Sequence, residues 1–144
     1  MNFREKKEYL EQYQNLKRKI NRINLQIDEI RLAKMSPSLV LDGMPHGSET
    51  SDLSNYAARL DEKINELMET HKKSGELLVE ITDSIKTMSD EREKDVLQFR
   101  YVMGWTWDTI SNRMDYSRQQ VIRIHNNAIE DFEPCVKDVT ECYT

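Results

Sequence analysis

The chain has 144 residues, of which 38% are hydrophobic and 33% charged, with four glycines, three prolines and a net charge of −5. This polar composition with few helix-breaking residues is typical of long helices and coiled coils and argues against one large globular core. No stretch approaches the roughly 20 apolar residues that a membrane span requires, and residues 1–34, with fourteen charges, do not form a secretory signal. We therefore expect a cytoplasmic protein without a membrane partner.

Residue patterns that would indicate an enzyme are missing. Cys135 and Cys142 lie near the C-terminus, as expected of reduced thiols in a cytosolic protein. His46, His71 and His125 do not have the spacing of metal ligands. No nucleotide-binding glycine loop and no nucleophile with a partner base is recognisable. The sequence thus predicts neither an enzyme nor a cofactor or metal site.

The first quarter of the chain carries a heptad repeat. Its apolar side chains recur with alternating steps of four and three residues, which is the spacing of a coiled-coil seam. No glycine or proline interrupts the run, and this predicts a helix from about Asn2 to Lys34. The seam residues are Tyr9, Tyr13, Leu16, Ile20, Ile23, Ile27 and Ile30.

A loop and a second heptad helix follow. Residues 35–52 contain two prolines and two glycines, which predict a loop. Asp52 or Ser54 is then expected to cap the second helix. The polar residues His71 and Ser74 interrupt its seam. The seam residues are Leu53, Ala57, Leu60, Ile64, Leu67, His71, Ser74, Leu78, Ile81, Ile85 and Met88.

Two helices of similar length joined by a loop fold back most simply as an antiparallel hairpin, here over residues 1–89. Tyr56 and Leu77 lie beside the strict seam of the second helix. Because a two-helix hairpin buries little surface, these side chains predict a further apolar contact. We therefore expect self-association as a homodimer.

Residues 90–133 predict a trihelical helix-turn-helix. The first helix runs from about Asp90 to Met103, and Gly104 ends it in a left-handed conformation. Thr106 is expected to cap a short second helix, Trp107–Met114.

The turn between the second and third helices has the residues that a steep helix crossing needs. Such a crossing requires a small residue at the contact, here Ser111, and a left-handed residue in the turn, here Asp115. Ser117 caps the third helix, whose inner face carries Val121 and Ile124. The side chains left to point outward are Arg118, Gln119, Gln120, Ile122, Arg123, Asn126 and Asn127.

These outward side chains have the chemistry of DNA readers. Arginine pairs with guanine and glutamine with adenine in the major groove, so we predict that they form the DNA-binding site. DNA-binding domains are usually basic, however, and residues 90–133 sum to −3, whereas residues 1–34 sum to +4. The acidic balance counts against strong non-specific binding by this module.

The module resembles region 4 of the sigma-70 family of RNA polymerase sigma factors. Residues 91–101 look like the opening helix of that region, which is followed by a glycine, as Gly104 is here. Residues 107–111 resemble the next helix, and residues 117–121 resemble the start of the recognition helix. The resemblance implies a DNA-binding fold, with double-stranded DNA as a partner and RNA polymerase as a further candidate partner.

Three departures qualify this resemblance. Ser111 and Asp115 stand where the family often has alanine and glycine, but serine is small and aspartate tolerates the left-handed conformation. Regions 1 to 3 of a sigma factor are absent, and a helical hairpin takes their place. This arrangement resembles small late-transcription regulators encoded by phages and prophages of Gram-positive bacteria.

We therefore predict an all-α protein with a long antiparallel coiled-coil hairpin (1–89), a trihelical helix-turn-helix domain (90–133) and a C-terminal tail (134–144). The predicted function is sequence-specific DNA binding as a transcription regulator of phage or prophage late genes. The alternative is a structural, assembly or DNA-packaging protein that acts through its hairpin.

Overall fold

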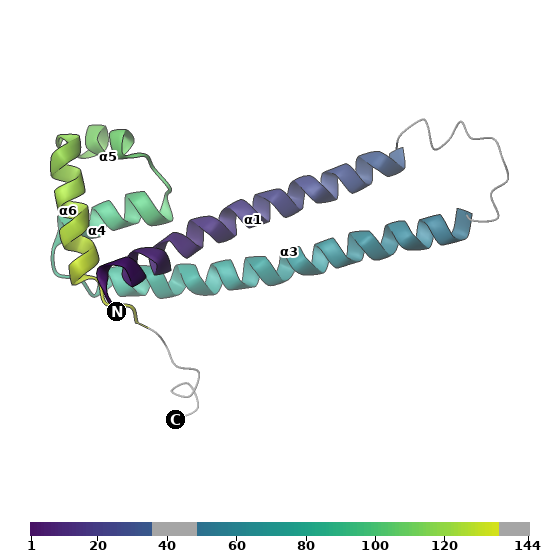
Figure 1. Cartoon of the computed structure of the whole chain (residues 1–144), viewed down its shortest axis with the longest axis horizontal. Coiled ribbons are helices and arrows are strands. Elements are labelled where there is room, and N and C mark those ends of the chain that lie inside the picture. Colours follow the sequence, from purple (N-terminus) through teal and green to yellow (C-terminus); the bar gives the residue numbers. More distant parts are fainter. Residues whose placement is uncertain (36–48, 136–144) are drawn as a thin grey trace, which may run out of the picture. The chain divides into compact units, whose positions relative to one another are not determined.

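The structure, a computed structural model, describes residues 1–35 and 49–135. Throughout these residues the secondary structure is helical, without a strand, so the all-α class is confirmed for the described part of the chain (Figure 1). None of its helices is long and apolar enough to cross a membrane. The elements are α1 (Phe3–Met35), α3 (Glu49–Lys86), α4 (Glu91–Leu97), the π-helix η1 (Gln98–Val102), α5 (Trp107–Met114) and α6 (Arg118–Asp131).

The two long helices occur in the predicted order. The limits of α1 agree with the prediction to within a residue. By contrast, α3 begins at Glu49, so Asp52 and Ser54, which were predicted as caps, lie inside it. The rest of the predicted loop lies outside the described residues.

Contacts divide the chain into two compact units, residues 16–73 and residues 1–15 together with residues 74–144. The first fifteen residues thus pack with the C-terminal module. The domain limits 1–89, 90–133 and 134–144 stay a prediction, as does coiled-coil pairing of α1 and α3 along their whole length.

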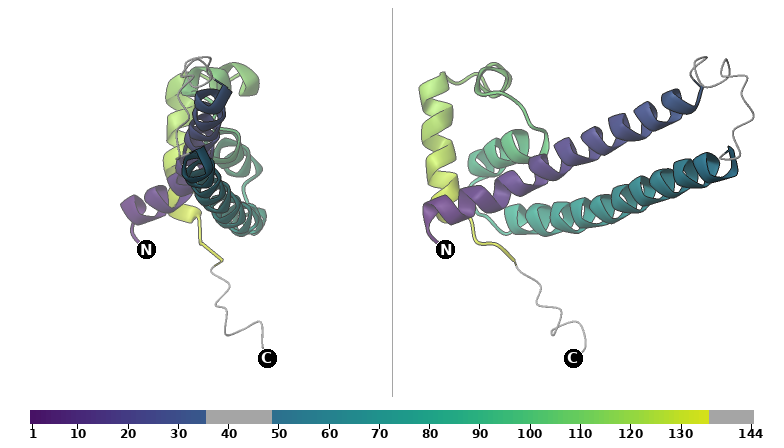
Figure 2. Two further views of the ribbon diagram at one scale, coloured as in Figure 1. Left: turned by 90° about the vertical axis from the view of Figure 1, so that its right-hand side faces the viewer. Right: turned by 45° about the vertical axis from the view of Figure 1, so that its right-hand side comes forward.

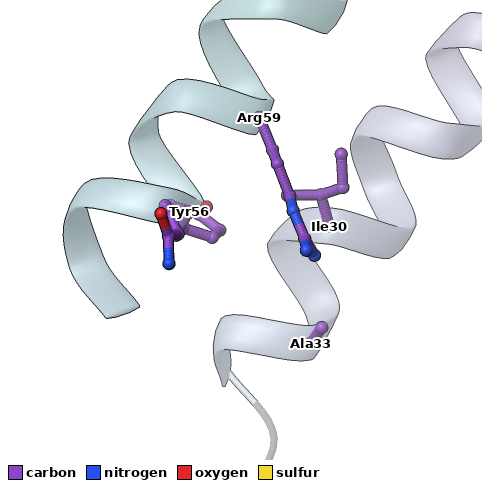
Figure 3. A pocket seen from close by; sticks show the side chains of 5 residues that line it. Ile30, Ala33, Tyr56 and Arg59 are labelled. Atoms are coloured by element: carbon purple, nitrogen blue, oxygen red, sulfur yellow. The ribbon is translucent and has the colours of Figure 1, made fainter. Parts of the chain in front are cut away.

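In the unit of residues 16–73, segments of α1 and α3 lie side by side (Figures 1 and 2). Ile23 and Ile27 of the predicted seam are buried. A hollow of about 260 Å³ is lined by Ile30 and Ala33 of α1 and by Asn55, Tyr56 and Arg59 of α3 (Figure 3). Arg59 is the one charged side chain in this lining.

The buried face of α3 differs from the predicted seam. Leu53 is 53% exposed, and His71 is exposed while its neighbour Thr70 is buried. Thr70 satisfies its hydroxyl by donating to the carbonyl oxygen of Glu66 at 2.7 Å. Leu77, predicted to face a second copy, is buried as well. A helix has 3.6 residues per turn, so a strict 3.5-residue repeat drifts around it and neighbouring positions take over the buried face.

The core of the C-terminal unit draws on both ends of the chain. α1 contributes Leu10 and α3 contributes Ile81, while Leu97, Ile129 and Phe132 come from the helix-turn-helix region; all five are fully buried. Ser84 of α3, also fully buried, accepts a hydrogen bond from the Cys135 backbone N–H at 2.9 Å. The helix-turn-helix therefore shares a core with the part of α1 up to residue 15 and the part of α3 from residue 74.

Candidate nucleic-acid interface

The local signals of the helix-turn-helix are confirmed. Gly104 has a φ of 73° and Asp115 a φ of 58°, both left-handed. Thr106 Oγ1 accepts from the Thr109 N–H at 3.2 Å. Ser117 Oγ accepts from the Gln120 N–H at 3.2 Å, and Gln120 Oε1 accepts from the Ser117 N–H at 3.0 Å. This reciprocal capping box fixes where α6 begins.

A small apolar core holds α5 and α6 together. Val96, Ile110 and Val121 are fully buried at its centre. The Ser111 hydroxyl donates to the carbonyl oxygen of Tyr116, which ties α5 to the turn before α6. The partly buried side chains around this centre are Phe99, Trp105, Trp107, Met114, Tyr116 and Ile124. Both tryptophans thus serve packing, as the sequence predicted.

The predicted contact residues lie on α6 and at its start. Ile122 is half-buried, so its side chain is only partly available. Gln120 is exposed, but its side-chain oxygen is used by the capping box. The exposed members of the set are Arg118, Gln119, Gln120, Arg123, Asn126 and Asn127. Their contact with DNA stays a prediction.

An ion pair joins α5 to the first residue of α6. Arg118 Nη1 lies 3.7 Å from Asp108 Oδ1, and the two side chains are 60% and 77% exposed. Exposed pairs of this kind contribute little to stability. The Arg118 guanidinium is therefore held loosely and remains available to another acceptor.

The π-helical turn η1 was not predicted. The sequence predicted one regular helix to Met103, but residues 98–102 widen into a π-turn, with the Met103 N–H bonded to the Gln98 carbonyl at 2.9 Å. Gln14 of α1 donates from Nε2 to the carbonyl oxygens of Tyr101 and Val102, both at 3.0 Å. The widened turn is thus satisfied by a side chain from the other end of the chain.

The burial of His125 was also not predicted from the sequence. His125 is 3% exposed, and its Nε2 lies 2.6 Å from the Tyr101 hydroxyl. Its ring and that of Trp107 pack in a T-shaped arrangement, with centroids 4.8 Å apart. Burial, helped by the positive charges of Lys7 and Arg100 and opposed by a hydrogen bond with Asn126, lowers the pKa of His125 to about 4.

The neutral ring of His125 therefore fastens α6 to η1 and α5. Its position four residues after Val121 and four before Ile129 places it on the inner stripe of α6. That spacing was the signal that could have identified it.

α1 holds the C-terminal end of α6. The Lys6 ammonium, almost fully buried, donates to the carbonyl oxygen of Glu130 at 2.8 Å and lies 3.6 Å from the Glu133 carboxylate. A cation at this end also complements the helix dipole. The Tyr9 ring packs against Phe132 with centroids 6.0 Å apart.

The carboxyl groups of Glu93 and Asp131 form a pair where α4 begins and α6 ends. Glu93 is buried, and burial, together with a hydrogen bond and the nearby charge of Asp131, raises the pKa of Glu93 to about 7. Asp90 caps α4 by accepting from the Arg92 N–H at 2.9 Å and the Glu93 N–H at 3.3 Å. The described residues contain no group of three or more histidine, cysteine, aspartate or glutamate side chains that could hold a metal.

The geometry defines a helix-turn-helix with a capped, exposed third helix, which is the architecture of a DNA-binding module. Residues 90–131 match the family model described as Sigma-70, region 4. These residues therefore form a sigma-70 region 4-like helix-turn-helix domain. No curated protein and no solved structure matches the chain.

Proposed function

We propose that this protein is a sequence-specific DNA-binding transcription regulator whose reader is α6. The observation that carries the proposal is the division of α6 into two faces. Val121, His125 and Ala128 are buried against the module, whereas Arg118 and Arg123 remain exposed. The family match over residues 90–131 gives this exposed face its expected ligand.

The reader would act from the N-terminal end of α6. Arg118 and Gln119 occupy the first turn, where recognition helices meet base edges. Arg123 lies more than one turn further on, in reach of a phosphate or a second base. The capping box and the His125 contact already hold α6 in place, so the helix does not need to be ordered by DNA binding.

The partner proposals extend the same function. The region 4-like fold supports RNA polymerase as a second partner, and the resemblance to small phage and prophage regulators supports late genes as targets. Self-association now rests on Leu25 and Leu32, which are 58% and 60% exposed and one heptad apart on α1. Light scattering at micromolar concentration tests the dimer, and a monomer in the absence of any partner would contradict it.

The decisive experiment selects bound duplexes from a random pool and then measures affinity for the enriched site and for an unrelated duplex. We expect one enriched site for the full chain. The variant with Arg118, Gln119 and Arg123 all replaced by alanine should bind both duplexes equally. Arg92→Ala, which removes an exposed cation of α4 in the same module, is the matched control and should keep the preference.

Absence of any enriched site, or an unchanged preference in the triple variant, would overturn the proposal. A function in assembly or DNA packaging through the long helices would then lead.

A further inference from the structure

One stretch of α1 is free of acidic residues. Residues 12–27 contain no aspartate or glutamate, although the whole chain has 26 acidic residues in 144. The stretch carries four cations, Lys17, Arg18, Lys19 and Arg22, which we call the basic face, and six asparagine or glutamine side chains. Solvated helix faces of coiled coils usually alternate charges of both signs. This one does not.

The side chains of the basic face are available to solvent. Lys17, Arg18 and Arg22 are exposed and Lys19 is half-buried, while the nearby Ile23 is buried on the other side of the helix. The amides Asn21, Asn24 and Gln26 are exposed as well. Lys19 and Arg22 form no ion pair with any residue that the structure describes.

The part of α3 in the same unit carries charges of both signs. Residues 49–73 sum to −2. Lys63 lies 3.4 Å from Glu66 and Lys73 lies 3.6 Å from Glu69, so two of the four cations in this segment are paired within the helix. The excess of positive charge in the unit of residues 16–73 is therefore confined to α1.

The chemistry of the basic face suits phosphate. Lysine, arginine, asparagine and glutamine are side chains that contact the sugar–phosphate backbone, whereas nearby carboxylates would repel it. The region 4-like module sums to −3 and can neutralise few phosphates itself. A chain that reads DNA with an acidic module needs its backbone affinity from elsewhere.

We propose that the basic face of α1 is a second DNA-contacting surface that binds the phosphate backbone of a duplex without regard to sequence. The inference rests on the proposed function, because it assigns affinity to α1 and specificity to α6. The two contributions respond differently to salt and to base sequence, so they can be separated by experiment.

The test measures the affinity of the full chain for the selected duplex and an unrelated duplex between 50 and 300 mM salt. Replacing all four cations of the basic face by glutamine should reduce the slope of log K against log salt by about 2 to 4, since each neutralised phosphate contributes roughly 0.9. At 100 mM salt both duplexes should bind about 10- to 1000-fold more weakly, with their ratio unchanged.

Two variants serve as matched controls. The first control variant removes the same charge from α3 and should leave the slope unchanged. In it, glutamine replaces Arg59, Lys63, Lys72 and Lys73. Exchanging lysine for arginine and arginine for lysine throughout the basic face keeps the charge and should keep the slope. Circular dichroism verifies that helix content is equal in all variants.

An unchanged slope in the glutamine variant, or an equal change in the α3 control, overturns the inference. If that unchanged slope comes with lost binding to RNA polymerase, the basic face serves an acidic protein surface instead. When the reader variant of α6 still loses its sequence preference, the proposed function stands and only this inference falls. Failure of the unaltered protein to bind any duplex overturns both.

Discussion

Protonation of His125 should weaken the C-terminal unit as the pH falls. The folded pKa of about 4 lies below the ordinary value of 6.5, so the unfolded state binds more protons between these two values. The contribution of His125 to the free energy of unfolding is therefore present in full well above pH 6.5, and it declines as the pH falls towards 4. From pH 7.5 to pH 5 the loss should be about 2 kcal/mol, of a total of roughly 3 kcal/mol.

The assay is urea unfolding followed by tryptophan fluorescence. Trp105 and Trp107 are the chain's two tryptophans, so the signal reports on the helix-turn-helix. In His125→Gln the amide can still meet the Tyr101 hydroxyl but does not titrate. The stability difference between the unaltered protein and this variant should therefore shrink by about 2 kcal/mol between pH 7.5 and pH 5.

Other titrating groups do not confuse the comparison. Glu93 has a raised pKa and changes stability in the opposite direction, but it is present in both proteins and cancels in the difference. His71→Gln, at an exposed position on α3, should retain the full pH dependence. A difference between His125→Gln and the unaltered protein that does not vary with pH would refute the reasoning.

Three further predictions concern positions that hold or use α6. Lys6→Met should lower the free energy of unfolding by about 1–3 kcal/mol, because the Glu130 carbonyl loses its charged donor; Lys72→Met is the control, and equal urea midpoints would contradict the prediction. Gly104→Ala should destabilise by about 1 kcal/mol or more, since its φ is left-handed and a Cβ would lie 2.9 Å from Gln14 Oε1; thermal unfolding at an unchanged midpoint would disprove this. Arg118→Ala should weaken binding to the selected duplex by about 1–3 kcal/mol and relax the preference at one base pair, without changing helix content; an anisotropy titration that gives the same affinity and preference would count against the assignment.

Features set by neighbouring residues were predictable from the sequence. The caps at Thr106 and Ser117 and the left-handed Asp115 depend on side chains within three residues, and each lies where the sequence placed it. Gly104 ends the opening helix as expected. These signals also define α6, so the set of exposed candidate contacts could be predicted apart from the partial burial of Ile122.

Features set by distant residues were not predictable. The π-turn η1 depends on Gln14, 87 and 88 residues away in sequence from the carbonyls it satisfies. From the sequence alone, Lys6 is indistinguishable from a solvated cation, because its partner Glu130 is 124 residues away along the chain. The choice of Thr70 over His71 likewise follows from how a long helix winds past its neighbours, which a seven-residue pattern does not record.

The contact between Lys6 and the end of α6 can form only after nearly all of the described chain has been synthesised. α1 leaves the ribosome before α6, and its Tyr9 packs against Phe132, which lies near the end of the described chain. Contacts so remote in sequence form late in folding. A nascent chain that stops before residue 128 lacks the buried residues Ala128, Ile129 and Phe132 and the Glu130 carbonyl that Lys6 caps. Interrupted translation products would therefore carry the long helices without a complete α6, and under the proposed function we expect them to compete poorly with the full-length chain for DNA.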